Sequence, residues 1–120
     1  MQKAILLVED DEMLIDLLGS FLEMEGYNVI VANDGIQAVE LYSKNYAEIV
    51  AVLTDMGLPK LGGWEMSHKL REINKDVKII FSSGYFNKDL REKIIAEGGV
   101  DYIQKPYDLE KMVELIKTLG

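Results

Sequence analysis

The chain has 120 residues, of which 48% are hydrophobic and 28% charged, a composition typical of one globular domain. Its formal net charge of -8 argues against direct binding to nucleic acid or to anionic membranes. The absence of cysteine excludes disulfide frameworks and thiolate metal sites. The first apolar stretch, residues 1–8, is too short for a signal peptide or a membrane span, so we expect a cytoplasmic domain without membrane insertion.

Short apolar runs alternate with amphipathic stretches along the whole chain. The apolar runs predict five strands, at residues 4–8, 29–32, 49–54, 77–81 and 100–104. Apolar residues at helical spacing predict five helices, at residues 14–22, 36–42, 64–73, 87–97 and 109–119. Strict alternation of strand and helix predicts an α/β domain with a mainly parallel sheet and helices on both faces. No linker, repeat or low-complexity tract interrupts this pattern.

Polar side chains stand at the ends of four of the five predicted strands. Glu9 and Asp10 follow the first strand, Asp55 the third, Ser83 the fourth and Lys105 the fifth. The carboxyl ends of parallel strands share one edge of the sheet, which is where open α/β sheets bind ligands. Three carboxylates gathered there would repel one another unless a cation joined them. An all-oxygen set of this kind suits Mg²⁺, which also binds phosphate oxygens.

Asp55 is the candidate for chemistry at this edge. It ends a buried apolar run, and Gly57 and Pro59 stop the strand directly after it. A carboxylate can act as a nucleophile and form an aspartyl phosphate. The metal, Lys105 and Ser83 would then hold the phosphoryl oxygens.

Four short motifs in this order carry a resemblance to a known family. They are residues 7–11 (LVEDD), 55–59 (DMGLP) with Gly63, 83–85 (SGY) and 105–107 (KPY). The sequence resembles a response regulator receiver domain (CheY-like) of two-component signalling over essentially its whole length, residues 1–120. The resemblance implies a flavodoxin-like, doubly wound sheet of five parallel strands in the order 2-1-3-4-5, with five helices.

The resemblance also implies site residues. Asp55 is the implied phosphoacceptor, Lys105 contacts the phosphoryl group, Ser83 is the switch hydroxyl, and Tyr102 is the aromatic that changes rotamer with it. Mg²⁺ is the implied cofactor, and its ligands are Glu9, Asp10, Asp55 and the backbone carbonyl of Gly57.

Three of these assignments have rivals in the sequence itself. Asp11 competes for the acidic pair, but the position of Gly26 favours Glu9 and Asp10 and leaves Asp11 as a helix N-cap. Ser82 is a rival for the switch hydroxyl. Tyr102 is nearly as compatible with plain core packing as with switching.

The implied function is phosphoryl signalling. A histidine kinase or phosphotransfer protein would donate the phosphoryl group, and the domain would catalyse its own phosphorylation and dephosphorylation without turning over a metabolite. A downstream output domain or protein would bind the face formed by the fourth helix, fifth strand and fifth helix. The alternatives are a receiver cut from a hybrid sensor histidine kinase, and a receiver-like interaction module that is no longer phosphorylated. A haloacid-dehalogenase-type phosphohydrolase would need an aspartate where Gly57 stands.

Overall fold

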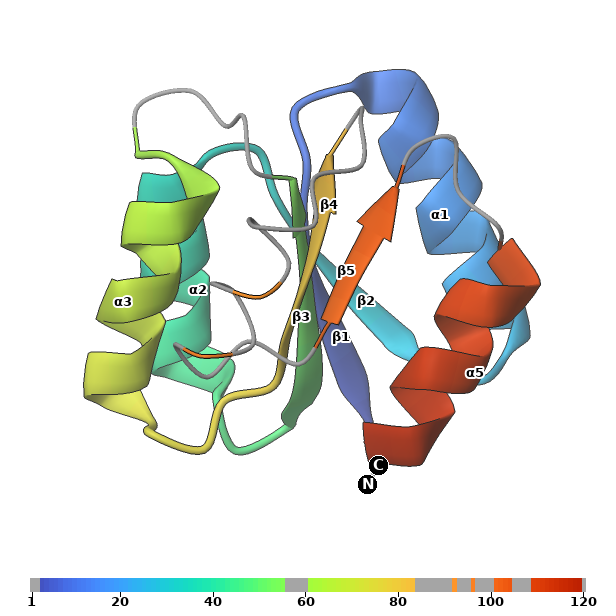
Figure 1. The fold of residues 1–120 in the computed structure, drawn as a ribbon. Coiled ribbons are helices and arrows are strands. Elements are labelled where there is room, and N and C mark those ends of the chain that lie inside the picture. Colours follow the sequence, from blue (N-terminus) through green and yellow to red (C-terminus); the bar gives the residue numbers. More distant parts are fainter. Residues whose placement is uncertain are drawn as a thin grey trace.

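The computed structural model describes residues 3–55, 61–83, 92, 96, 101–104 and 109–119 (Figure 1). Its strands are β1 (Ala4–Val8), β2 (Asn28–Ala32), β3 (Ile49–Asp55), β4 (Ile79–Ser83) and β5 (Asp101–Gln104). Its helices are α1 (Glu12–Met24), α2 (Gly35–Asn45), α3 (Gly63–Ile73) and α5 (Leu109–Leu119). The predicted helix at residues 87–97 lies mostly outside the described residues, although Glu92 and Ala96 within it are helical.

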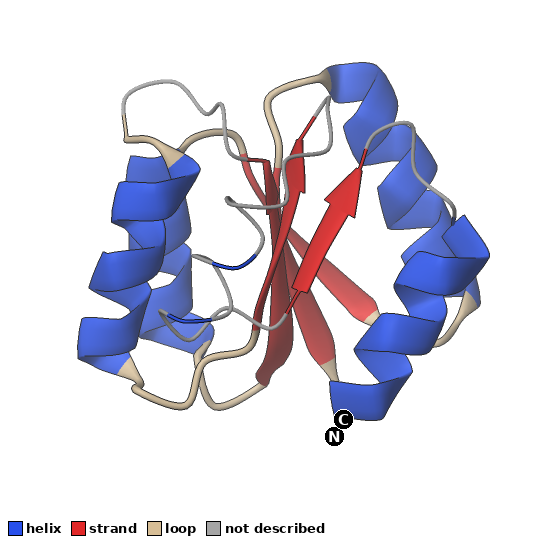
Figure 2. Cartoon of the chain, viewed as in Figure 1, coloured by secondary structure: helices blue, strands red, loops and turns tan. Residues whose placement is uncertain are grey.

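All five strands form one sheet in the order β2-β1-β3-β4-β5, and each neighbouring pair is parallel. The predicted strand order is therefore confirmed. Figures 1 and 2 show α2 and α3 on one face of the sheet and α1 and α5 on the other. This is the doubly wound arrangement, in which successive strands are added on opposite sides of β1: β2 on one side, and β3, β4 and β5 on the other.

The central strands are buried on both faces, which explains their unbroken apolar runs. Ala4, Leu6 and Val8 of β1 pack into one core, which we call the α2/α3 core. Ile5 and Leu7 point to the opposite side and pack into the α1/α5 core. Side chains in a strand alternate between faces, so a single apolar strand supplies both cores. Within the described part of the chain, no helix is long and apolar enough to cross a membrane.

Helix α1 begins and ends where the sequence supplies the right residues. The Asp11 carboxylate accepts hydrogen bonds from the backbone N–H groups of Met13 and Leu14, at 2.9 and 3.4 Å, which confirms it as the N-cap. The helix starts at Glu12, two residues before the predicted start, because this cap lies upstream of the first apolar residue. After the helix, Gly26 has a φ of 95°, a left-handed conformation that glycine adopts without steric cost.

Strand β4 lies two residues further along the chain than predicted. It covers Ile79–Ser83 rather than 77–81, so both serines belong to the strand instead of following it. Ser82 pairs with Ile103 and Ser83 with Gln104 of β5. The backbone N–H of Val52 still donates to the carbonyl of Lys78 at 2.8 Å, which places Lys78 beside β3 just ahead of the strand.

Candidate functional site

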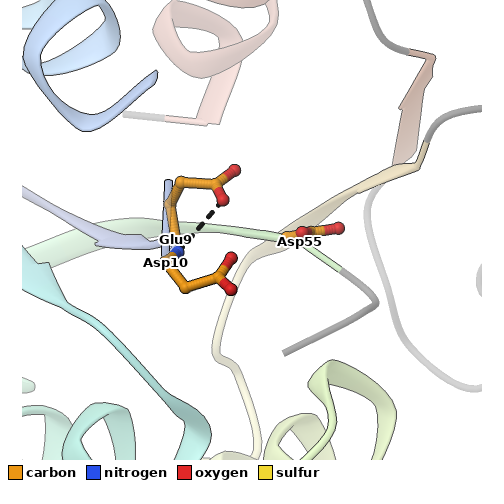
Figure 3. A group of neighbouring side chains, drawn as sticks. All are labelled: Glu9, Asp10 and Asp55. Carbon is orange, nitrogen blue, oxygen red and sulfur yellow. Dashed lines mark hydrogen bonds between the residues drawn. The ribbon is translucent and has the colours of Figure 1, made fainter. Parts of the chain in front are cut away.

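Glu9, Asp10 and Asp55 come together at the carboxyl edge of the sheet (Figure 3). Each offers one carboxylate oxygen, and these three atoms lie within 4.8 Å of one another. Glu9 and Asp10 follow β1 while Asp55 ends β3, so the cluster lies at the position where the winding of the sheet reverses. Among the described residues, this is the one group of three or more acidic or histidine side chains close enough to share a metal ion.

Glu9 is almost completely buried, with 1% of its surface exposed. One of its carboxylate oxygens accepts hydrogen bonds from the backbone N–H groups of Asp10 and Asp11, at 3.0 and 3.2 Å. Backbone donors of this kind offset part of the cost of burying a carboxylate. They also fix the direction of the side chain, so Glu9 is held in place by the turn that leads into α1.

Asp10 is exposed and Asp55 half-buried, so the cluster opens from the sheet toward solvent. The backbone around Asp55 is fixed by two buried hydroxyl residues. The Thr54 hydroxyl donates to the Asp55 carbonyl at 3.0 Å, and the Ser82 hydroxyl donates to the Thr54 carbonyl at 3.3 Å. Ser82 is also the β4 partner of Asp55 in the sheet. Asp55 therefore ends a strand whose last residues are tightly held.

These two hydroxyl groups were not assigned this role from the sequence. The sequence holds a signal for them, because Thr54 and Ser82 each directly follow an apolar run, and a buried hydroxyl is expected to find a backbone partner. Ser82 was considered only as a rival for the switch position.

The other predicted site residues are only partly described. Ser83 and Tyr102 lie in β4 and β5, where Tyr102 pairs with Phe81 and Ser83 with Gln104. Their side chains lie outside the described part of the structure, as do Gly57 and Lys105 altogether. The structure thus brings together Glu9, Asp10 and Asp55, and places β4, which carries Ser83, next to β3, with β5, which carries Tyr102, one strand further along the sheet.

The fold and this edge define the chain as a flavodoxin-like α/β domain with three carboxylates at its switch point. The family model of the response regulator receiver domain matches residues 5–117. The chain therefore belongs to the response regulator receiver family of two-component signalling.

Individual relatives agree with this assignment. The chain is 33% identical over 115 residues to chemotaxis protein CheY of Treponema pallidum, covering 94% of this chain and 80% of that protein. It superimposes with a TM-score of 0.91 on a chain of the CheX–CheY–BeF₃–Mg²⁺ complex from Borrelia burgdorferi, at 27% identity, covering 97% of this chain and 87% of that one. For the receiver domain of sensor histidine kinase PA1611 from Pseudomonas aeruginosa PAO1, which has a magnesium ion in its active-site cleft, the TM-score is 0.86 at 29% identity, with 99% and 98% covered.

Other curated relatives are much longer than this chain. The chain spans 50% of one of them and 28% of another. These relatives carry further segments beside the part that this chain matches. Similarity to that part alone does not assign the activities of the whole proteins to this chain.

Proposed function

We propose that residues 1–120 form a receiver domain that accepts a phosphoryl group on Asp55, and that Mg²⁺ is held by Glu9, Asp10, Asp55 and the backbone carbonyl of Gly57. The observation that carries the proposal is the meeting of three carboxylate oxygens within 4.8 Å at the carboxyl edge. Close carboxylates destabilise one another when ionised, and a divalent cation relieves this repulsion. These ligands suit Mg²⁺, because all of their ligating atoms are oxygen and the three carboxylates carry negative charge. When bound, the metal supplies positive charge against phosphoryl oxygens.

In this proposal Asp55 is the nucleophile. One of its carboxylate oxygens forms a bond to phosphorus, while the bond from phosphorus to the donor's imidazole nitrogen breaks, which leaves an aspartyl phosphate. Glu9 is held by two backbone N–H groups, so its charge remains fixed beside the reacting carboxylate. Lys105 contributes a further positive charge to the phosphoryl oxygens. The donor is the phosphohistidine of a histidine kinase or of a phosphotransfer protein.

Ser83 is the proposed switch hydroxyl. Its rival Ser82 is fully buried, and its hydroxyl donates to the Thr54 carbonyl, which supports a structural role for Ser82. Hydrogen bonding of Ser83 to the phosphoryl group would draw the end of β4 inward, and Tyr102 on the neighbouring strand would turn toward the vacated space. Phosphorylation would in this way shift a two-state equilibrium and change the face formed by residues 87–97, β5 and α5, which an output domain or partner protein recognises.

Intact-mass spectrometry after incubation with acetyl phosphate and Mg²⁺ tests the acceptor. We expect a gain of one phosphoryl group in the wild type, its loss when the metal is chelated, and no gain in Asp55→Asn. Asp76→Asn, which changes an exposed aspartate in the turn after α3, is the matched control and should be phosphorylated normally. A phosphorylated Asp55→Asn protein at wild-type yield would contradict the assignment, and no phosphorylation of the wild type would favour the interaction-module alternative.

Thermal unfolding tests the metal separately from the chemistry. A ligand that binds only the folded state stabilises it by about 2.7 kcal/mol at roughly one hundred times its dissociation constant. We expect Mg²⁺ to raise the unfolding midpoint of the wild type, and to raise it less in Asp10→Asn. A midpoint that is unchanged at millimolar Mg²⁺ would argue against the site.

Amide NMR with beryllofluoride, a phosphoryl mimic, tests the switch. Shifts should spread through residues 83–107 in the wild type and remain near Asp55 in Ser83→Ala. Full transmission in the mutant would exclude Ser83 as the switch hydroxyl.

A further inference from the structure

The corner between β2 and α2, residues Asn33 to Gly35, is fixed by hydrogen bonds within itself. The Asp34 carboxylate accepts from the backbone N–H of Gln37 at 2.8 Å, and the Gln37 side-chain oxygen accepts from the backbone N–H of Asn33 at 2.7 Å. This reciprocal pair resembles a capping box and holds the first turn of α2 against the end of the strand. The corner is thus a stiff piece of backbone rather than a pliable turn.

One side of this corner is tied to the acidic site. The backbone N–H of Glu9 donates to the carbonyl of Ala32 at 3.0 Å. Ala32 is the last residue of β2 and directly precedes the corner. The backbone of Glu9, whose side chain is one of the three clustered carboxylates, is therefore attached to the strand end from which the corner starts.

The other side of the corner is packed against Leu61. Gly35 is buried, and a Cβ atom built on it would lie 2.8 Å from Leu61 Cβ and 2.9 Å from the Leu61 carbonyl carbon. Real Cβ atoms do not approach other atoms this closely, so only glycine lets the two backbones meet. Glycine is required at residue 35 by lack of space and not by backbone conformation, because among the described glycines it is Gly26 that has a positive φ.

Leu61 follows Asp55 by six positions along the chain and precedes α3, which begins at Gly63. Ala32 and the corner therefore link two segments that flank the acidic cluster: Ala32 bonds the Glu9 backbone after β1, and Gly35 packs on Leu61, which follows β3 in the chain. Glu9 directly follows β1 and Asp55 ends β3, and these two strands pair with each other in the sheet.

We propose that this corner is a positioning element for the acidic site, and that Gly35 is the residue on which it depends. Gly35 is not one of the clustered carboxylates, but its close contact fixes the position of Leu61, six residues after Asp55. A side chain at residue 35 would force Leu61 and the corner apart, and a shifted corner would move Ala32, whose carbonyl accepts from the Glu9 N–H. Metal binding by three carboxylates depends on their mutual distances, so its affinity falls. The inference rests on the proposed function, since it concerns the same metal site.

The test is the Mg²⁺ dissociation constant of folded protein, measured from the amide NMR shifts of Asp10 and Asp11, whose N–H groups bond the Glu9 carboxylate. Gly35→Ala should raise this constant about tenfold, the lower end of the effect seen when residues supporting metal ligands are changed. Gly62→Ala is the matched control. It lies next to Leu61 with a φ of -63°, and a Cβ built on it meets nothing within 4 Å, so its dissociation constant should be that of the wild type.

A second variant covers the case in which Gly35→Ala does not fold. Gln37→Ala removes the exposed acceptor that holds Asn33 and leaves Gly35 in place, so it should fold and raise the dissociation constant in the same direction by a smaller factor. Glu40→Ala, an exposed change further along α2, is its control.

The outcomes separate this inference from the proposed function. If the wild type does not bind Mg²⁺, the proposed function fails and takes the inference with it. If the wild type binds, and folded Gly35→Ala or Gln37→Ala binds equally well while being less stable, Gly35 and its corner serve the fold alone and the inference is wrong. A weaker metal site in these variants, with both controls unchanged, supports it.

Discussion

The two faces of the sheet are packed by different means. The α2/α3 core contains rings and a partly buried hydrogen bond: the ring centroids of Trp64 and Phe81 lie 5.7 Å apart, and Asn74 donates to the Tyr42 hydroxyl at 3.1 Å. Among the described residues, the buried members of the α1/α5 core are aliphatic apart from Met112, and its rings, Phe21 and Tyr27, are only partly buried. Aliphatic contacts depend mainly on volume, whereas rings, hydrogen bonds and close backbone approaches depend on geometry. The α2/α3 face should therefore tolerate substitution less well than the α1/α5 face.

The largest effect is expected from truncating Phe81, which is fully buried in the α2/α3 core. Phe81→Ala should lower the free energy of unfolding by about 3–5 kcal/mol. It should also change the fluorescence of Trp64, because Trp64 is the only tryptophan and its ring packs on Phe81. Urea unfolding followed by fluorescence and by circular dichroism measures both effects.

Leu53→Ala is the comparison for Phe81→Ala on the other face. Leu53 is equally buried but packs in the α1/α5 core, so it should cost about 2–5 kcal/mol. Its folded state should keep the Trp64 emission of the wild type. If Leu53→Ala changes that emission as much as Phe81→Ala does, the two cores are not independent and the contrast between the faces is wrong.

Glycine-to-alanine substitutions on the two faces should change the free energy of unfolding in opposite directions. Gly35→Ala in α2 forces a Cβ against Leu61, and overpacking of this kind costs about 1–3 kcal/mol. Gly19→Ala in α1 meets nothing within 4 Å, and replacing a mid-helix glycine should stabilise the protein by about 0.5–1 kcal/mol. Thermal unfolding midpoints should thus move down for the first variant and up for the second. Equal shifts of the two midpoints would show that close packing around a glycine does not distinguish the faces.

The contrast between the faces also marks where prediction from sequence works. Apolar runs gave the strands and both cores, because burial of a central strand requires nothing beyond apolar side chains. The Asp11 cap could also be predicted, because an N-cap depends only on residues that are neighbours in the chain. Strand β4 was placed two residues too early, because Ser82 reads as polar although its hydroxyl is satisfied by the Thr54 carbonyl.

Contacts between distant segments could be predicted only where the topology of the sheet requires them. The acidic cluster followed from strand ends sharing an edge, which is a property of topology. The packing of Gly35 on Leu61 and the bond from Asn74 to Tyr42 depend on how α2 and α3 settle against each other, and no local pattern encodes it.

Tyr42, in the α2/α3 core, should make the free energy of unfolding depend on pH. Burial, partly opposed by the hydrogen bond from Asn74, raises the pKa of the Tyr42 phenol above its ordinary value of 10.0. The folded protein therefore keeps the phenol proton at a pH where the unfolded chain has lost it. The folded state then binds more protons than the unfolded state. The stabilisation that Tyr42 contributes is therefore fully present below about pH 10 and is lost as the pH rises further.

Tyr42→Phe should remove this alkaline loss and, at neutral pH, cost about 1 kcal/mol because Asn74 loses its acceptor. Urea unfolding at pH 7 and at several values above 10 measures both. Tyr46→Phe changes a more exposed tyrosine one turn along and should leave the pH profile as in the wild type. An unaltered alkaline slope in Tyr42→Phe would show that other groups cause it.

The smallest effect is expected for the ion pair between α5 and the end of α1. The Lys117 ammonium lies 3.3 Å from a carboxylate oxygen of Glu25, but the side chains are 56% and 35% exposed, so water and salt screen the attraction. Lys117→Gln should lower the free energy of unfolding by less than about 1 kcal/mol, and the difference from the wild type should shrink as NaCl is raised. Lys44→Gln, which changes an exposed lysine in the last turn of α2, is the matched control. A loss that exceeds that of Tyr42→Phe, or one that persists in high salt, would mean that the α1/α5 face also depends on a directional contact, and the distinction between the two faces would then reduce to their side-chain composition.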